Sequence, residues 1–137
     1  MFLEGPAQGR PVLLFLHGGP GMPEYWLTRR RPTRMHEGFT VAWWEQRGAG
    51  LSYHPDIPAA TMTVEQIVAD TLAVAQHLCR RFDVEKVHLM AHSWGSFIGL
   101  QAAARVAVGG EPLVEVGAQL IAVPLEPAGT RERVPAS

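Results

Sequence analysis

The sequence has little of what marks disulfide-stabilised, nucleic-acid-binding or membrane-spanning proteins. Its single cysteine, Cys79, cannot form an internal disulfide, and the helical pattern around it predicts a half-buried thiol. The 12 basic and 13 acidic residues leave a net charge of −1 without a basic stripe, so we expect no nucleic-acid partner. The longest apolar run, residues 12–16, is far shorter than the ~18 residues of a membrane span. Glu4, Gly5 and Pro6 interrupt any signal-peptide pattern, so we expect a cytoplasmic protein with no membrane contact.

The sequence also lacks residues and motifs that some catalytic and binding sites need. No histidine and no aspartate follows residue 92. The histidines and acids that are present show neither H-E-x-x-H nor another paired ligand spacing, so we predict no metal site and no cofactor. The glycine-bearing loops contain neither G-x-G-x-x-G nor G-K-[ST], which argues against nucleotide binding.

The chain is long enough for one domain with a core, because 47% of its 137 residues are hydrophobic. Uninterrupted apolar runs predict buried strands, and apolar residues at helical spacing predict helices. The expected strands are residues 12–16, 39–44 and 87–91, and the expected helices are residues 24–35, 64–82 and 97–104. Residues 1–11, with two glycines and two prolines, predict a leading loop. Thr63 and Gln66 fit a capping box in which Gln66 reaches back to Thr63.

This alternation of strands and helices predicts an α/β fold with a parallel sheet, right-handed crossovers and flanking helices. The carboxyl ends of parallel strands lie at one edge of the sheet. We therefore expect the loops after residues 16 and 44 to lie beside the corner at Ser93.

Ser93 stands between the strand at 87–91 and the helix that follows, where it is a candidate nucleophile. A sharp strand-to-helix corner needs very small residues two positions before and after the serine. Ala91 and Gly95 meet this need, giving A-x-S-x-G where G-x-S-x-G is usual. Small residues also surround serines by chance, so this pattern alone does not identify an active site.

Two glycine-rich loops follow the earlier strands. In His17-Gly18-Gly19-Pro20-Gly21, the glycines leave backbone N–H groups free to face a ligand, and such a loop can cradle an oxyanion. Taken by itself, this loop is better explained as a tight turn. The second loop is Glu45-Gln46-Arg47-Gly48-Ala49-Gly50-Leu51-Ser52.

Together with His92-Ser93-Trp94-Gly95-Ser96, these loops resemble the α/β-hydrolase fold, and more narrowly its proline iminopeptidase branch, which carries HGGPG, DQRGxGxS and GxSWGS. The resemblance covers about residues 12–105 and departs from the pattern at Glu45 and Ala91. It implies a serine hydrolase that cleaves amide or ester bonds of a small-molecule or short-peptide substrate through an acyl-serine. It also implies Ser93 as nucleophile, with the N–H groups of Trp94 and of Gly19 or Gly18 as the oxyanion hole.

The partners of the serine are missing from the expected place. A serine hydroxyl needs a histidine to take its proton and an acid to orient that histidine, and in this fold both follow the nucleophile in the chain. The acids after Ser93 are Glu111, Glu115, Glu126 and Glu132, and we expect none of them at a strand end. Of the histidines, we interpret His17 as structural and expect the side chain of His92 to point away from Ser93. His36, His54, His77 and His88 are expected in helix ends, connectors or strands and not as a base. Because losing a triad member costs about 10⁴ in rate, we expect a very weak catalyst.

The last segment, residues 106–137, diverges from the family pattern. Leu120–Val123 is a candidate fourth strand, and residues 126–137 resemble a polar tail. We expect a single partial domain over residues 1–137, truncated after the helix that follows Ser93: a fragment, a frame-altered product or a shortened relative. A second function class therefore stays open, a non-catalytic α/β-hydrolase-like module that binds a ligand or a partner. An unpaired sheet edge in such a module would favour self-association.

Overall fold

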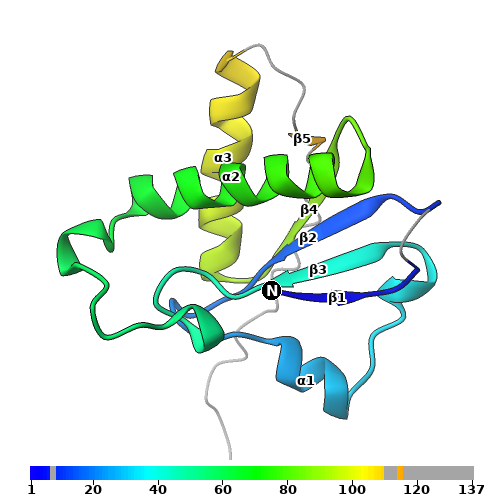
Figure 1. Cartoon of the computed structure of the whole chain (residues 1–137), viewed down its shortest axis with the longest axis horizontal. Helices are drawn as coiled ribbons and strands as arrows, with labels where there is room; N and C mark the ends of the chain where they lie inside the picture. The colour runs from blue at the N-terminus through cyan, green and yellow to red at the C-terminus, as the bar shows by residue number, and fades with distance from the viewer. Residues whose placement is uncertain (7–8, 110–113, 116–137) are drawn as a thin grey trace, which may run out of the picture.

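The computed structural model describes residues 1–6, 9–109 and 114–115 (Figure 1). Within these ranges a five-stranded sheet has the order β1-β3-β2-β4-β5. Its strands are β1 (Phe2–Glu4), β2 (Val12–Leu16), β3 (Thr40–Trp44), β4 (Val87–Ala91) and β5 (Val114–Glu115). The four strands from β2 to β5 run parallel, and β1 joins the edge strand β3 antiparallel. The predicted α/β fold class is confirmed.

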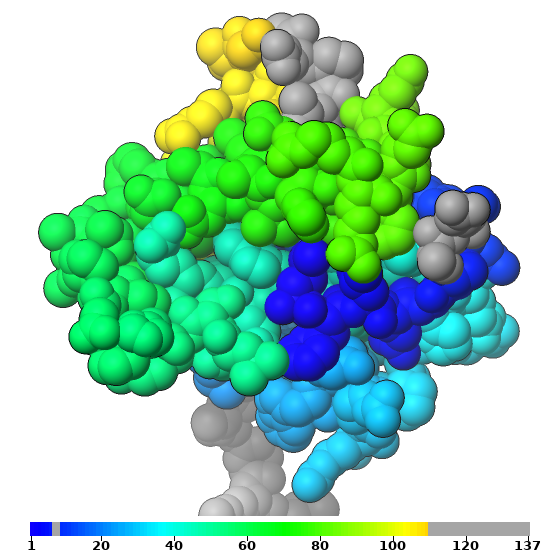
Figure 2. Space-filling model, viewed as in Figure 1, coloured from blue at the N-terminus to red at the C-terminus, as the bar shows by residue number. Residues whose placement is uncertain are grey.

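Three α-helices and three short 3₁₀ turns accompany the sheet in the described ranges. They are α1 (Tyr25–Arg30), η1 (Met35–Glu37), η2 (Gly50–Ser52), η3 (Ala59–Thr61), α2 (Val64–Phe82) and α3 (Trp94–Gly109). Figure 1 shows α2 and α3 together on one side of the strands, with α1 on the other. In the space-filling view, the side chains of α2 form a broad band across the visible face (Figure 2). None of these helices is long and apolar enough to span a membrane.

The residues of β2 alternate between two apolar layers. Leu14 and Leu16 are fully buried and face α2, where they pack with Leu78. Leu13 and Phe15 point to the opposite face, the side of α1 and η1. Because both faces are covered, every residue of β2 is buried, as the uninterrupted apolar run predicts for an interior parallel strand.

Three elements differ from the sequence prediction. The helix expected over residues 24–35 ends at Arg30, because Arg31 precedes Pro32 and a residue before proline disfavours the helical conformation. The leading loop contains β1, which is only three residues long and is held by its pairing with β3. The helix expected over residues 97–104 extends from Trp94 to Gly109. The candidate strand Leu120–Val123 and the polar tail lie outside the described residues.

Helix α2 begins as predicted but is capped differently in one detail. Thr63 Oγ1 accepts the backbone N–H of Gln66 at 3.2 Å, which confirms Thr63 as the N-cap. The side chain of Gln66 does not reach back to Thr63; it donates to Oδ1 of Asp70 at 2.9 Å instead. Burial raises the pKa of the Cys79 thiol in the same helix, which disfavours its thiolate form, and the half-buried side chain packs against the core.

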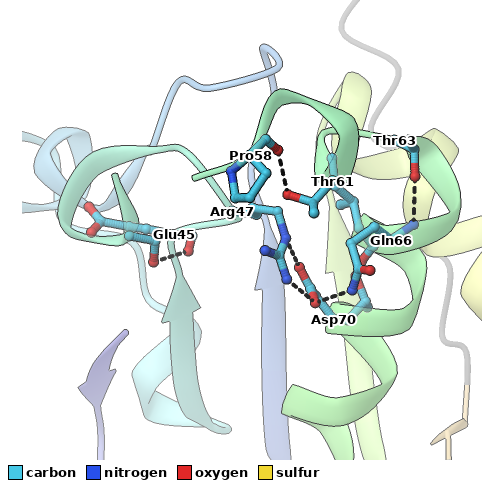
Figure 3. Close-up of polar contacts among 10 residues, drawn as sticks. Glu45, Arg47, Pro58, Thr61, Thr63, Gln66 and Asp70 are labelled. Carbon is cyan, nitrogen blue, oxygen red and sulfur yellow. Dashed lines mark hydrogen bonds and ion pairs between the residues drawn. The ribbon is translucent and has the colours of Figure 1, made fainter. Parts of the chain in front are cut away.

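An ion pair ties the loop after β3 to α2. Arg47 donates from Nε and Nη2 to the two oxygens of Asp70 at 2.7 and 2.8 Å. Figure 3 shows the guanidinium directed at Asp70, with Gln66 approaching the same carboxylate from the helix. Burial raises the pKa of Asp70, but the hydrogen bonds from Arg47 and Gln66 outweigh burial and hold the pKa below its ordinary value. Arg47 therefore has a structural role in this loop.

Replacing Asp70 with asparagine should lower the free energy of unfolding by about 1 kcal/mol near neutral pH, because charge-assisted hydrogen bonds become neutral ones. The pKa of Asp70 is lower in the folded protein than its ordinary value of 3.8, so the carboxylate stabilises the fold above that value. This stabilisation disappears as the pH falls through the folded pKa. Urea titrations should therefore show the wild type and D70N converging in acid.

The matched control is Asp56→Asn, which alters a carboxylate whose side chain is 86% exposed. Its effect on unfolding should be smaller than that of D70N near neutral pH. A difference between wild type and D70N that stays constant from neutral to strongly acidic pH would contradict the ion-pair assignment.

Candidate active site

The chain turns sharply from strand to helix at Ser93. Strand β4 ends at Ala91 and α3 begins at Trp94, and Ser93 between them has a positive φ of 51°. A positive φ is unusual for a residue other than glycine and stores strain. The backbone N–H of Gly95 closes the turn on the carbonyl of His92 at 2.8 Å. Ser93 itself is exposed at the carboxyl end of the strand.

The turn is possible because α3 approaches β2 very closely. A Cβ atom on Gly95 would lie 2.0 Å from the carbonyl oxygen of Leu16, a distance that no side chain can occupy. The methyl group of Ala91 faces Gly99, where an added Cβ would lie 3.6 Å from it, an ordinary contact distance. The small residue expected two positions after the serine is thus required by backbone contact at Gly95.

The glycine-rich loop after β2 lies against this turn. A Cβ on Gly18 would come within 3.3 Å of the Cβ of Ser93. The N–H of Gly18 donates to Oε1 of Glu24 at 3.3 Å. The next residue, Gly19, has a φ of 119°, and a side chain there would collide with the backbone of Gly21. Among the described residues, no acceptor takes the N–H of Gly19 or of Trp94.

A buried network joins the three motifs. The N–H of Gln46 donates to Nε2 of His17 at 3.0 Å, so Nε2 carries no proton and Nδ1 must donate to the carbonyl of Gly18 at 2.8 Å. The side-chain amide of Gln46 donates to the carbonyl of His17 at 2.9 Å and accepts from Nε1 of Trp94 at 3.2 Å. With both ring nitrogens engaged, His17 has a structural role, as the sequence interpretation expected.

Glu45, the other departure from the family pattern, closes its own loop. Its buried carboxylate accepts the N–H of Leu51 at 2.7 Å, and its carbonyl accepts the hydroxyl of Ser52 at 2.7 Å. The glutamate therefore stabilises the loop after β3 and does not face Ser93.

Within the described residues, no other candidate group is hydrogen-bonded to the hydroxyl of Ser93. No hydrogen bond joins a histidine to Oγ of Ser93, and His36, His54 and His92 lie beside carboxylates of their own. Glu115 occupies β5, contrary to expectation, but pairs in register with His88 near the start of β4, away from the edge that carries the serine. Glu111, Glu126 and Glu132 are outside the described residues. No cluster of three or more His, Cys, Asp or Glu residues within the described part could hold a metal ion.

The structure also pairs two residues that sequence analysis did not connect. Nδ1 of His92 lies 2.5 Å from Oε1 of Glu24, the oxygen that also accepts the N–H of Gly18. The two residues are 68 positions apart, and no local pattern links them. Both line a cavity of about 390 Å³ on the α1 side of the sheet, with apolar walls that include Phe15, Trp43 and Met90; Ser93 does not line it.

Substituting Gly95 with alanine should destabilise the protein by about 3 kcal/mol or more, because the backbone of α3 or β2 must move to admit the methyl group. Thermal or urea unfolding measures the loss. The matched variant is Gly109→Ala, where an added Cβ meets no atom within 4 Å, and it should change stability by less than about 0.5 kcal/mol. Equal stability of the two variants would refute the close approach described above.

The chain is similar to known proteins over most of its length. The Bacillus subtilis (strain 168) protein named probable aminopeptidase YbaC is 41% identical over 100 residues, which are 73% of this chain and 31% of that protein. The proline iminopeptidase-related protein of Thermus thermophilus superposes with a TM-score of 0.62 at 35% identity, covering 77% of this chain and 35% of that one. Epoxide hydrolase VrEH1 of Vigna radiata superposes with a TM-score of 0.59 at 28% identity, covering 77% and 31%.

The chain spans about a third of the length of the curated relatives that it matches. The resemblance to the proline iminopeptidase branch is confirmed by these relatives, while the epoxide hydrolase shows that the same fold also occurs with another named activity. A model of the alpha/beta hydrolase fold matches residues 11–112, which include β2, β3, β4 and α3. The chain therefore belongs to the α/β-hydrolase fold family.

Proposed function

We propose that Ser93 is the nucleophile of a serine hydrolase that cleaves amide or ester bonds of small-molecule or short-peptide substrates. The observation that carries this proposal is the positive φ of Ser93, which holds an exposed hydroxyl at the carboxyl end of β4 and the start of α3. The names of the relatives, an aminopeptidase and a proline iminopeptidase-related protein, favour amide substrates with a free amino end.

The backbone donors beside Ser93 suit the developing charge. In acyl transfer, Oγ forms a bond to the carbonyl carbon, and the carbonyl oxygen becomes an oxyanion that needs hydrogen-bond donors. Trp94 follows the serine in the chain, and Gly19 follows Gly18, where an added Cβ would be 3.3 Å from the Cβ of Ser93; the N–H groups of Gly19 and Trp94 have no acceptor among the described residues. The N–H of Gly18 already donates to Glu24, which favours Gly19 as the donor from this loop.

Among the described residues, the proposed reaction lacks a group that takes the hydroxyl proton of Ser93. When the C–N or C–O bond breaks, that proton must reach the leaving amine or alcohol, and water must then hydrolyse the acyl-serine. No histidine follows Ser93, and those that precede it make no hydrogen bond to its hydroxyl in the described structure. We therefore expect acylation by strongly electrophilic reagents and almost no turnover, with a rate about 10⁴ below that of a complete triad.

A specific observation favours the alternative, a non-catalytic module. Helix α3 exposes apolar side chains at helical spacing, with Phe97, Leu100 and Val108 at 49%, 61% and 90% exposure. Exposed apolar stripes of this kind mark contact surfaces. A module that used this surface would not need a reactive serine.

A fluorophosphonate separates the two functions. The reagent should label the chain slowly, as a bond forms between Oγ of Ser93 and phosphorus and fluoride leaves. Labelling measured by intact-protein mass spectrometry should vanish in Ser93→Ala and persist in Ser96→Ala, a serine one helical turn away in α3. Equal labelling of the chain and Ser93→Ala, or no labelling of either, would favour the non-catalytic module.

A further inference from the structure

Glu24 occupies an unusual position for a residue at a helix start. Its carbonyl accepts the N–H of Leu27 at 2.9 Å, so its backbone begins α1. Its side chain makes no capping hydrogen bond to its own helix. The carboxylate turns instead toward the glycine-rich loop and the serine corner, and only 18% of the side chain is exposed. A carboxylate that leaves a favourable helix N-terminus needs compensating partners.

The two partners of Oε1 come from different motifs. One is the N–H of Gly18 in the glycine-rich loop, at 3.3 Å, and the other is Nδ1 of His92, at 2.5 Å. His92 immediately precedes Ser93, and its own backbone N–H donates to the carbonyl of Leu16 at 3.1 Å, which fixes it in the sheet. A single oxygen atom thus bridges a loop with few side chains to a residue held rigidly beside the nucleophile.

The spacing around Gly18 shows how tightly these parts meet. A Cβ on Gly18 would lie 3.1 Å from Nδ1 of His92, 3.3 Å from Oε1 of Glu24 and 3.3 Å from the Cβ of Ser93. The peptide of Gly18 is therefore enclosed by the pair and the serine. Its N–H is directed at the carboxylate, whereas the following N–H, that of Gly19, has no acceptor among the described residues.

We propose that Glu24 and His92 are positioning residues: through the shared oxygen Oε1 they hold the peptide between His17 and Gly18 against Ser93 and so set the position of the next N–H, that of Gly19, as the loop donor of the oxyanion hole. This inference rests on the proposed function. It assigns a role to two residues other than the proposed nucleophile and oxyanion-hole donors. The pair acts through the loop and does not touch the reacting atoms. It also gives His92 a task other than that of a base.

The first test measures the loop without using the reactivity of Ser93. Hydrogen exchange of the Gly18 amide, followed by two-dimensional NMR of the folded chain, should be slowed in the wild type by its bond to the carboxylate. In Glu24→Ala the exchange should accelerate at least about tenfold, and His92→Ala should have a similar effect, because a charge-assisted hydrogen bond is lost. The control Glu65→Gln changes an exposed glutamate on α2 and should leave the Gly18 amide as in the wild type.

The second test measures the consequence at the serine. The rate of fluorophosphonate labelling should fall about 10- to 100-fold in Glu24→Ala and His92→Ala, while the thermal midpoint changes little. Glu24→Gln keeps an acceptor at Oε1, and His92→Asn keeps a donor near Nδ1, so these variants should recover most of the labelling rate. A purely structural pair would shift the midpoint and the labelling rate together and would show no such recovery.

The outcomes are separable from the fate of the proposed function. If the wild type is not labelled at Ser93, the proposed hydrolase is refuted. The exchange rate of the Gly18 amide still tests whether the pair holds the loop. An unchanged Gly18 exchange rate in both alanine variants overturns the positioning role, whatever the labelling shows. An unchanged labelling rate with accelerated exchange overturns the link between the loop and the oxyanion hole.

Discussion

The contact between the first turn of α3 and the end of β2 governs the geometry around Ser93. The carbonyl oxygen of Leu16 accepts the N–H of His92, and the same oxygen leaves no space for a side chain on Gly95. Because the glycine-rich loop starts one residue later at His17, this one carbonyl joins the loop, the serine corner and the helix. The Gln46 network then extends the connection to the loop after β3.

Local sequence patterns were sufficient wherever one segment determines its own structure. The apolar run Val12–Leu16 predicts an interior strand because every residue of such a strand is buried, and Thr63 predicts the start of α2 because a cap acts within one turn. The order of the motifs along the chain predicted that Ser93 lies between a strand and a helix, and the relatives confirm the fold family. The roles of Ser93, Gly19 and Trp94 stay predictions.

Long-range pairings could not be predicted from the sequence because neither partner belongs to a local pattern. Glu24 and His92 meet across 68 positions, and Arg47 and Asp70 meet across 23. Strand β1 has three residues, too few for a periodicity, and exists through pairing with β3. Gln66 illustrates the same limit: its spacing from Thr63 predicts a reciprocal cap, but the carboxylate of Asp70, already bound to Arg47, is the better acceptor for its amide.

The strain at Ser93 shows why a formed serine corner does not by itself demonstrate catalysis. A non-glycine residue at positive φ costs about 1–2 kcal/mol. The surrounding burial offsets this readily, since Leu14, Leu16 and Ile98 are fully buried and each contributes about 1.5–3 kcal/mol. The packing of α2 and α3 against each other and against the sheet therefore maintains the strained serine whether or not a base is present. The serine corner depends on segments close to it in the fold, whereas a base for Ser93 would have to come from a separate element. This chain contains the segments that form the corner, but it has no histidine after Ser93 that could serve as the base.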